Sequence, residues 1–587
     1  MSDGHGIDLA LLNSRGTAPW RALGRHRRLI VLGVLLGLAG AAAALAQPAL
    51  IGALVAAVDD GRPLTGLLLA GAALFLGDAL LGALHAYVIS RAGENIVYDL
   101  RGALSSRLLR SRFASYQRWP QGDVFSRMVA DTSLARATMT YAVDEIASSA
   151  FMLVGGLVLM IWVDWLLLLV TVGCLGVTSL VSLFIAHRVR VESVANRADV
   201  SNFGTALIRV LGALPTVKAS RAEKREAEDL AHIAHQARRS GLKVSVLASM
   251  LDPVTNVGLQ LALTVVITLG AARTGSGAME AANLTEFILY LFYLIGPLIS
   301  LFTAIAQFQL GRASIDRLAD LGTVELEEAE PEEPPRALSL VKTGEPGLVF
   351  DGVSFTYPGK EQPVLENVSF TVPSRGLTAI VGPSGSGKTT LFQLVERFHD
   401  PDSGTIRLDG TDIARLPLTE LRSAVGYVDQ DHTLLSGTLR ENLLYAAPDT
   451  GDEYLAPALS LAHLTDVVDE LPDGLDTVLG DAGRGLSGGQ RQRLAIARTI
   501  LQTPGYLLLD EATANLDSAS EKALRDTIAM LSEYCAVVAI AHRLSTVVQA
   551  EHIIVLDRGR VRAEGTHSEL VREDELYRDL AAFQQLG

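Results

Sequence analysis

Six long apolar runs, all within the first 311 residues, limit what this chain can fold into. The first, residues 29–58, is 30 residues long and contains no charge, and about 20 apolar residues suffice for a helix to cross a bilayer. Ala44-Leu45-Ala46 resembles a signal-peptide cleavage site, but the apolar run continues well past it, whereas signal-peptide cores end after roughly 7–15 residues. We therefore predict six retained membrane spans, at residues 29–58, 64–90, 146–163, 165–187, 253–272 and 287–311.

Positive charge is distributed unequally between the connections of these spans. The basic residues in the short connections 59–63, 164 and 273–283 are only Arg62 and Arg273. Segment 91–142 carries eight Arg, segment 188–250 carries eleven Lys or Arg, and five Arg precede the first span. Because Lys and Arg concentrate on the cytoplasmic side of a membrane protein, we expect both termini in the cytoplasm and the chain in the inner (plasma) membrane.

The two basic segments are 52 and 63 residues long and rich in helix-forming residues. Loops of that length without secondary structure are uncommon. We expect the spans to continue as helices beyond the membrane, so that each basic segment forms a long helical hairpin in the cytoplasm.

A change in composition divides the chain. Residues 322–346 contain seven Glu, two bases and four Pro, which is typical of a solvated linker. After it, short β-branched runs at 377–381, 507–509, 536–540 and 553–556 alternate with helical patterns, as in an α/β domain. The predicted divisions are a cytoplasmic segment (1–28), a six-span domain (29–321), a linker (322–346) and an α/β domain (347–587).

The net charge of −15 argues against nucleic-acid binding, which needs a basic surface to replace counterions on the phosphates. This charge is unevenly spread, with +5 in residues 1–321, −5 in 322–346 and −15 in 347–587. The chain has only two cysteines, Cys174 and Cys535, which excludes a disulfide framework and a multi-cysteine zinc site.

A glycine-rich motif follows the strand-like run at 378–381. Its sequence, GPSGSGKTT, fits the phosphate-loop pattern at Gly382, Gly387, Lys388 and Thr389. Glycines allow successive backbone N–H groups to point at phosphate oxygens, and the next helix directs its positive end at the same place. We expect Lys388 to reach the β- and γ-phosphates and Thr389 to bind Mg²⁺.

Two carboxylates, Asp510 and Glu511, end a second apolar run. A carboxylate beside the phosphate loop is suited to hold Mg²⁺, and the next one can polarise a water for attack on the γ-phosphate.

Between these motifs lies LSGGQRQRLAIAR, residues 486–498. Ser487 and the glycines after it precede a helix whose N-terminus can face an anion. This segment resembles the signature of the ATP-binding cassette (ABC) superfamily. Six spans, two cytoplasmic hairpins and one C-terminal nucleotide-binding domain together resemble a bacterial half-transporter of the ABC exporter fold, with a six-helix polytopic membrane domain and an α/β P-loop ATPase domain.

The resemblance implies roles for further residues. Tyr357 stands where the family stacks an aromatic ring on adenine, Gln430 where a glutamine senses Mg²⁺, and His542 where a histidine contacts the γ-phosphate. Glu511, His542 and Lys388 are the expected catalytic residues, and Thr389, Gln430 and Asp510 the expected Mg²⁺ ligands. The expected ATP-binding residues are Tyr357, Gly382, Pro383, Ser384, Gly385, Ser386, Gly387, Lys388, Thr389, Thr390, Gln430, Ser487, Gly488, Gly489, Gln490 and Asp517.

Some positions depart from the family pattern. Asn515 stands where a small residue is more common, Asp481 where a Glu precedes the signature, and Arg209 where a Glu is frequent. Residues 122–131, with Gly122, Asp123, Ser126, Arg127 and Asp131, resemble the first cytoplasmic turn that docks on the nucleotide-binding domain.

Two ionisable residues, Asp78 and His85, lie within the second predicted span. They are seven residues apart and therefore on nearly one helical face. Ionisable groups in lipid are costly and usually face a cavity or a partner, so this pair belongs to the substrate pathway, is a structural polar pair, or lies at the membrane interface.

The resemblance implies ATP hydrolysis that is coupled to transport and needs ATP and Mg²⁺. Because the phosphate loop of one domain meets the signature of another, the chain needs a second half-transporter. We expect a homodimer or a heterodimer in the lipid bilayer that exports an amphipathic small molecule, lipid or peptide, and no nucleic-acid partner. An importer built on the exporter fold, with siderophore-like cargo, and the competent half of a heterodimer are the alternatives, because the sequence names neither cargo nor direction.

Overall fold

The computed structural model describes residues 24–327, 347–480, 485–510, 518–541, 543 and 547–585. The chain divides into two compact units. We call residues 1–109 and 120–323 the helical unit, and residues 110–119 and 324–587 the α/β unit.

Among the described residues, the helical unit contains six helical stretches that are long and apolar enough to cross a membrane, which confirms the six predicted spans. They extend well beyond the apolar runs, as expected for helices that continue out of the bilayer. Its helices are α3 (Arg27–Asp59), α4 (Thr65–Leu109), α6 (Gln121–Ser126), α7 (Thr132–Ala137), α8 (Val143–Val163), α9 (Trp165–Gly212), α10 (Leu214–Ala219), α11 (Glu223–Ala248), α12 (Leu251–Gly275) and α13 (Ala281–Leu321), with π-helical turns at Arg127–Asp131 and Thr138–Ala142.

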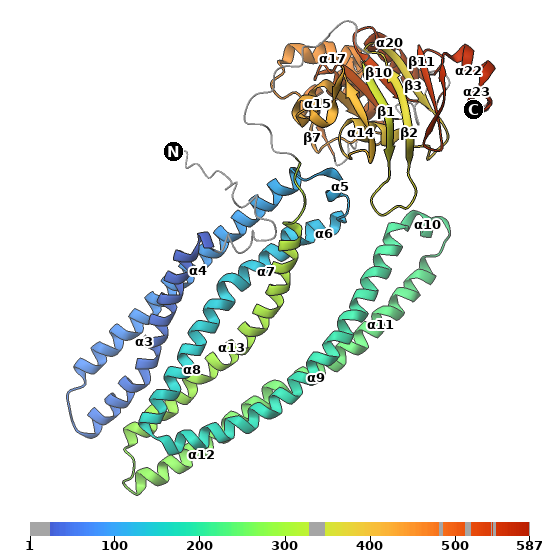
Figure 1. Cartoon of the computed structure of the whole chain (residues 1–587). Coiled ribbons are helices and arrows are strands. Elements are labelled where there is room, and N and C mark those ends of the chain that lie inside the picture. The colour runs from blue at the N-terminus through green and yellow to red at the C-terminus, as the bar shows by residue number, and fades with distance from the viewer. Residues whose placement is uncertain are drawn as a thin grey trace. The chain divides into compact units, whose positions relative to one another are not determined.

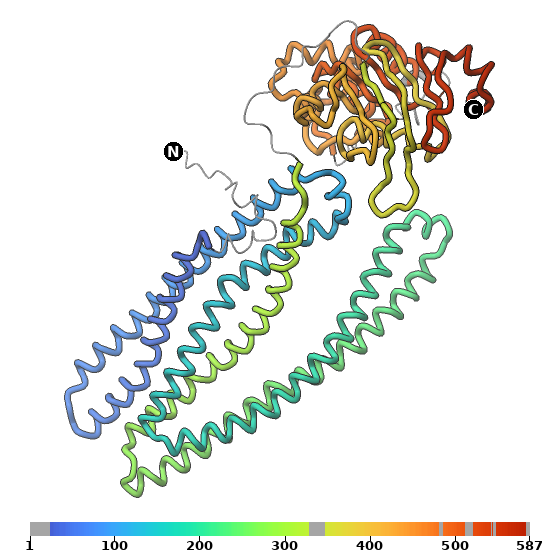
Figure 2. The backbone as a smooth tube through the Cα atoms, in the orientation of Figure 1, coloured from blue at the N-terminus to red at the C-terminus, as the bar shows by residue number. Residues whose placement is uncertain are grey.

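These helices pack in two groups. Helices α3, α4, α8 and α13 pack against one another, while α9 packs along α11 and α12 (Figure 1). Figure 2 shows α9, α10 and α11 as one long continuous hairpin. Large apolar side chains such as Leu69, Leu76 and Leu80 of α4 are exposed in the isolated chain, as expected of helices solvated by lipid.

One short turn joins α8 to α9 at Asp164. The Asp164 carboxylate accepts hydrogen bonds from the N–H groups of Leu166 and Leu167 at 3.0 and 2.9 Å and so caps α9. It also forms an ion pair with Arg273 of α12 at 2.9 Å. The α8–α9 turn is therefore tied to the end of α12.

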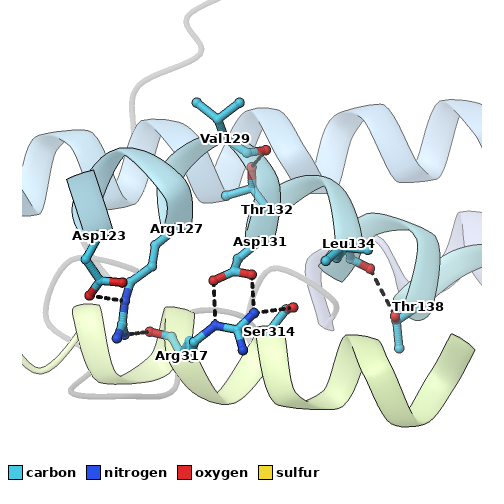
Figure 3. Close-up of polar contacts among 9 residues, drawn as sticks. All are labelled: Asp123, Arg127, Val129, Asp131, Thr132, Leu134, Thr138, Ser314 and Arg317. Atoms are coloured by element: carbon cyan, nitrogen blue, oxygen red, sulfur yellow. Dashed lines mark hydrogen bonds and ion pairs between the residues drawn. The ribbon is translucent and has the colours of Figure 1, made fainter. Parts of the chain in front are cut away.

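Polar contacts join α13 to the segment around the first π-helical turn (Figure 3). Arg317 of α13 donates to the Asp131 carboxylate and to Ser314. Arg127 donates to Asp123 at 2.9 Å and to the carbonyl of Arg317 at 2.6 Å. Residues 123–131 are therefore held on α13 within the helical unit.

The α/β unit is built on two main sheets. A four-stranded antiparallel sheet has the order β2-β1-β4-β5, and a six-stranded sheet has the order β12-β11-β3-β10-β9-β6. The strands are β1 (Leu348–Phe355), β2 (Leu365–Val372), β3 (Gly376–Val381), β4 (Ser403–Leu408), β5 (Thr411–Asp412), β6 (Val425–Val428), β7 (Gly437–Thr438), β8 (Val478–Leu479), β9 (Tyr506–Asp510), β10 (Ala536–Ile540), β11 (His552–Asp557) and β12 (Arg560–Gly565).

The centre of the six-stranded sheet is parallel. Every residue of β3, β9 and β10 is buried, as in a parallel sheet covered on both faces. The four runs predicted as strands correspond to β3, β9, β10 and β11. The helices of this unit are α5 (Phe113–Tyr116), α14 (Lys388–Val395), α15 (Leu418–Ala424), α16 (Leu439–Leu444), α17 (Leu455–Leu461), α18 (Thr465–Glu470), α19 (Gly488–Ile500), α20 (Ser518–Ser532), α22 (His567–Glu573) and α23 (Glu575–Gln585).

The tip of the first predicted hairpin, Arg110–Trp119, belongs to the α/β unit. The N–H of Arg112 donates to the carbonyl of Glu325 and the N–H of Glu327 to the carbonyl of Arg110, both at 2.8 Å. Phe113 of α5 packs against Phe398 with ring centroids 4.8 Å apart. Residues 110–119 thus pack within the α/β unit, whereas residues 122–131 belong to the helical unit, and their expected docking stays a prediction.

The chain between the two units is short. Helix α13 ends at Leu321, and the α/β unit resumes at Val324. Glu327 then forms a bidentate ion pair with Arg422 at 3.0 and 2.8 Å. Only residues 322 and 323 of the predicted linker therefore lie between the end of α13 and the α/β unit.

Candidate functional site

The phosphate loop lies between β3 and α14 and has the backbone that its glycines allow. Gly385 and Gly387 have φ angles of 78° and 102°, a left-handed conformation that glycine adopts without a Cβ clash. A Cβ on Gly387 would lie 2.7 Å from Leu365 Cδ2 and 3.1 Å from the carbonyl oxygen of Val364. The loop can therefore curl tightly over the start of α14, where backbone N–H groups favour an anion.

Two polar side chains are buried in this loop. Lys388 is 6% exposed, and its Nζ donates to the carbonyls of Gly382 and Pro383 at 2.9 and 3.0 Å. Ser386 is 3% exposed, and its Oγ has no hydrogen-bond partner among the described residues. An ammonium group and an unpaired hydroxyl inside a loop of this shape fit a phosphate group.

Asp510 lies beside the loop because β3, β10 and β9 run parallel in neighbouring positions. Ile540 pairs with both Ile380 and Asp510, so the three strands end at the same edge. Asp510 is completely buried, and Thr389 Oγ1 donates to Asp510 Oδ1 at 3.3 Å. A hydroxyl and a carboxylate at this distance are the oxygen ligands that Mg²⁺ takes together with phosphate oxygens.

Tyr427 of β6 is half-buried beside the same carboxylate. Burial and the negative charge of Asp510 raise the pKa of the Tyr427 hydroxyl, which hydrogen-bonds to Asp510. The tyrosine therefore stays neutral and helps to hold Asp510 in place. The sequence analysis did not include Tyr427 in the site, although it lies three residues before Gln430 in the same motif.

The signature segment begins α19. Ser487 Oγ accepts from the N–H of Gln490 at 3.2 Å, and Gln490 Oε1 accepts from the N–H of Ser487 at 2.7 Å. This reciprocal capping box fixes the start of the helix. Ser487 and Gly488 are exposed, whereas Gly489 is buried, so the first turn presents a hydroxyl and backbone N–H groups to solvent.

Comparison with known proteins agrees with this geometry. A family model described as "ABC transporter" matches residues 365–514, and one described as "ABC transporter transmembrane region" matches residues 30–298. A "Multidrug resistance ABC transporter ATP-binding and permease protein" of Lactococcus lactis subsp. lactis is 32% identical over 93% of this chain and 92% of its own length.

The chain belongs to the ABC transporter family.

Other relatives are also transporters. An "ATP-dependent lipid A-core flippase" of Thiobacillus denitrificans is 31% identical over 92% of each chain. The solved "Structure of a bacterial Atm1-family ABC exporter with ATP bound" has 28% sequence identity and a TM-score of 0.77, covering 95% of this chain and 98% of that one. This ABC transporter therefore has the exporter fold, with membrane and ATP-binding domains fused in one chain, and is an ATP hydrolase coupled to transport.

Tyr357 lies close to the phosphate-loop helix of the ABC transporter. Its hydroxyl donates to Gln393 Oε1 at 2.9 Å and lies 3.0 Å from Thr390 Oγ1. Its ring contacts His399 edge-on, with centroids 5.3 Å apart. Burial lowers the pKa of His399, so an uncharged imidazole lies beside the tyrosine. His399 was missed because no motif surrounds it.

Gln430 follows β6, whose register with β9 pairs Val428 with Leu509. Gln430 therefore lies two residues past the end of β6, at the sheet edge where β9 ends with Asp510. Glu511, Asp517 and His542, together with Asp481, lie outside the described residues, and their roles remain predictions.

Asp78 and His85 of α4 do not form a pair with each other. Gln47 of α3 donates to Asp78 Oδ2 at 3.1 Å, and Tyr293 of α13 donates to Gln47 Oε1. His85 instead contacts the carbonyl of Gly33 of α3 and the carboxylate of Asp144 of α8. The structure thus separates the predicted pair into two polar clusters. It adds Asp144, which lies 59 residues after His85 on another helix, so no sequence spacing indicates it.

Proposed function

We propose that this ABC transporter works as one half of a dimeric exporter. In the proposed dimer, the phosphate loop of each subunit binds ATP against the signature segment of the other, and the helices change the side of the membrane to which the cargo cavity opens. The observation that carries this proposal is the cluster of Lys388, Ser386 and the Thr389–Asp510 oxygen pair at one sheet edge, in a chain with six membrane helices.

Exposed apolar residues on the α9–α11 hairpin support a partner subunit. Residues 188–250 are expected to leave the membrane, yet Val191, Val194, Val200, Ile208, Leu211, Leu242 and Val246 are each at least 50% exposed. Apolar surface of this extent in water marks an interaction site. The proposed partner is either a second copy of this chain or a homologue.

In the proposed reaction each residue has one task. Lys388 leaves its carbonyl partners to bind the β- and γ-phosphates, and Thr389, Asp510 and Gln430 hold Mg²⁺, which would neutralise phosphate charge. Glu511 takes a proton from the attacking water, His542 contacts the γ-phosphate, and Ser487 and Gly489 bind it from the second subunit. Tyr357 stacks on adenine, and Asp517 contributes to the dimer seam.

We propose that the cargo is an amphipathic small molecule, lipid or peptide that leaves the cytoplasm, with the ATP-binding domain inside the cell and the spans in the inner membrane. The named relatives are a multidrug resistance protein, lipid A-core flippases and an exporter. No observation favours the importer alternative.

The test uses the purified full-length chain in vesicles, with Glu511→Gln as the catalytic variant. We expect ATP-dependent uptake only into vesicles whose ATP-binding domains face outward, and a loss of hydrolysis of roughly 100-fold or more in the variant, the usual size of a general-base effect. The variant should still associate when ATP is added. Native mass spectrometry of the extracted complex identifies the partner. Uptake in the opposite orientation would contradict export, and near-wild-type turnover of Glu511→Gln would contradict the assigned base.

A further inference from the structure

A cavity of about 290 Å³ lies within the helical unit, between α4, α8 and α13. Its polar lining includes His85 from α4, Asp144 and Glu145 from α8, and Ser300, Thr303 and Gln307 from α13. His85 lies five residues before the end of the second predicted span, and Glu145 directly precedes the third. The cavity therefore lies near the cytoplasmic end of the predicted spans, where cargo from the cytoplasm would first arrive.

The hydrogen bonds of His85 determine the charge of its pair with Asp144. His85 Nδ1 lies 2.9 Å from the carbonyl oxygen of Gly33. Because a carbonyl can only accept, Nδ1 carries a proton. His85 Nε2 lies 3.0 Å from Asp144 Oδ2, and this contact also needs a proton, on either the imidazole or the carboxyl group. In both cases the pair as a whole has no net charge.

Beyond the His85–Asp144 contact, the cavity has two further hydrogen-bond acceptors, Asp144 Oδ1 and the Glu145 carboxylate. Asp144 is 5% exposed, and its second oxygen, Oδ1, is buried and has no hydrogen-bond partner among the described residues. Glu145 accepts a hydrogen bond from Ser149 at 3.1 Å. Within the part of the chain that the structure describes, neither carboxylate has an ion pair with Lys or Arg. An ionised Glu145 thus gives the cavity a net charge of −1, and Asp144 Oδ1 adds an unused acceptor.

The rest of the lining suits an organic group better than a metal ion. Ile89, Ala304 and Tyr141 line the same cavity. An aromatic ring attracts an organic cation. The described residues contain no group of three or more His, Cys, Asp or Glu that could hold a metal ion.

We propose that this cavity binds the singly charged ammonium group of an organic cargo, with Glu145 as its counter-ion, Asp144 Oδ1 as a further acceptor and the apolar wall in contact with the cargo's body. The proposal rests on the proposed transport function and narrows its cargo to organic cations. A buried carboxylate oxygen without a donor is costly, and a bound ammonium would satisfy it.

The test measures equilibrium binding of radiolabelled benzylammonium, whose N–H groups can donate to Asp144 Oδ1, to the detergent-purified full-length chain. We expect saturable binding to the wild type, a loss of affinity of tenfold or more in Glu145→Gln and in Asp144→Asn, and recovery in Glu145→Asp, which restores the charge. Glu280→Gln removes the same charge from an exposed position outside this cavity and should bind like the wild type. The neutral molecule of the same shape, ethylbenzene, should not displace the probe.

Equal affinity in the wild type and Glu145→Gln, or displacement by ethylbenzene at the concentration of unlabelled probe, would overturn the cation site. Displacement by sodium ions at that concentration would overturn the organic cargo. ATP hydrolysis is measured on the same preparations, and uptake is measured after they are reconstituted into vesicles. If the wild type transports cargo but its affinity for the probe does not depend on Glu145, only the cavity proposal fails. If probe binding depends on the carboxylates but there is no ATP-driven uptake, the transport proposal is contradicted instead.

Discussion

Arg317 donates hydrogen bonds from two guanidinium nitrogens to the two carboxylate oxygens of Asp131, with Nε 2.8 Å from Oδ2. Asp131 is only 4% exposed and ends a π-helical turn, whereas Arg317 lies near the end of α13. Ser314 and the carbonyl contact from Arg127 complete this cluster (Figure 3). A fork-shaped donor that faces a carboxylate is geometrically specific, so the pair fixes how these two segments lie together.

We expect Asp131→Asn to lower the free energy of unfolding by about 1–3 kcal/mol, because it leaves the guanidinium with an imperfect partner. Arg317→Lys should also destabilise, since an ammonium cannot form the two parallel bonds. Asp316→Asn, one residue away and exposed, is the matched control. Thermal unfolding followed by circular dichroism measures the effect, and equal midpoints for all three variants would contradict it.

Gly311 marks a close approach of α13 to the second π-helical turn. A Cβ at this position would lie 1.4 Å from Thr138 Oγ1. Gly311→Ala should therefore cost roughly 1–3 kcal/mol, as overpacking does, and lower the yield of folded protein. Gly296→Ala on the same helix would meet no atom within 4 Å and should be neutral or slightly stabilising. Fluorescence-detected size exclusion compares the two.

Thr389 supplies the hydroxyl that lies 3.3 Å from Asp510. Thr389→Val keeps the shape and removes this oxygen, so we expect the Mg²⁺ concentration for half-maximal ATP hydrolysis to rise about tenfold or more, in line with the roughly 10–100-fold effects of groups around a metal site. Thr389→Ser keeps the oxygen and should stay near the wild-type value. An unchanged Mg²⁺ dependence in the valine variant would remove Thr389 from the proposed ligands.

Glu396 is 5% exposed, and burial raises its pKa to about 7, against a smaller opposing effect of Arg422. The folded state therefore keeps a proton that the unfolded chain releases at lower pH, so the free energy of unfolding falls as the pH rises from about 4.5 to about 7. Glu396→Gln should remove this decrease. We expect the free energy of unfolding of Glu396→Gln to exceed that of the wild type by about 1–3 kcal/mol at pH 8. The two values should match near pH 4.5, and thermal unfolding across that pH range measures them.

Phe113 contacts Phe398 in the α/β unit, and an aromatic pair contributes about 0.5–1.5 kcal/mol beyond its buried area. Phe113→Ala should loosen the Arg110–Trp119 turn and lower the cargo moved per ATP hydrolysed. Phe125→Ala removes an exposed ring of the helical unit and serves as the control. If both variants transport with wild-type stoichiometry, the turn does not carry the coupling.

The sequence predicts much of the architecture because some signals are local. Neighbouring residues alone indicate an apolar run longer than a membrane is thick, a mostly apolar strand such as β3, and a glycine-rich loop before Lys388. The glycine-rich loop lies beside Asp510 because parallel strands end at a common edge of the sheet.

Other features depend on contacts between distant segments. The partner of His85 is Asp144 on another helix, and two Arg-rich stretches give no sign that Arg110–Trp119 packs with the α/β unit. The π-helical turns have no compositional signature, because they arise where α7 and its flanks fit against α13.

The division of the chain into two units sets how many connections join them. Leu109 is followed by Arg110, Trp119 by Pro120 and Thr323 by Val324, so the chain passes from one unit to the other three times. Glu327, just after the third passage, is held by Arg422. Residues inserted after Leu321 would therefore lengthen one of three connections and leave the other two at their present length.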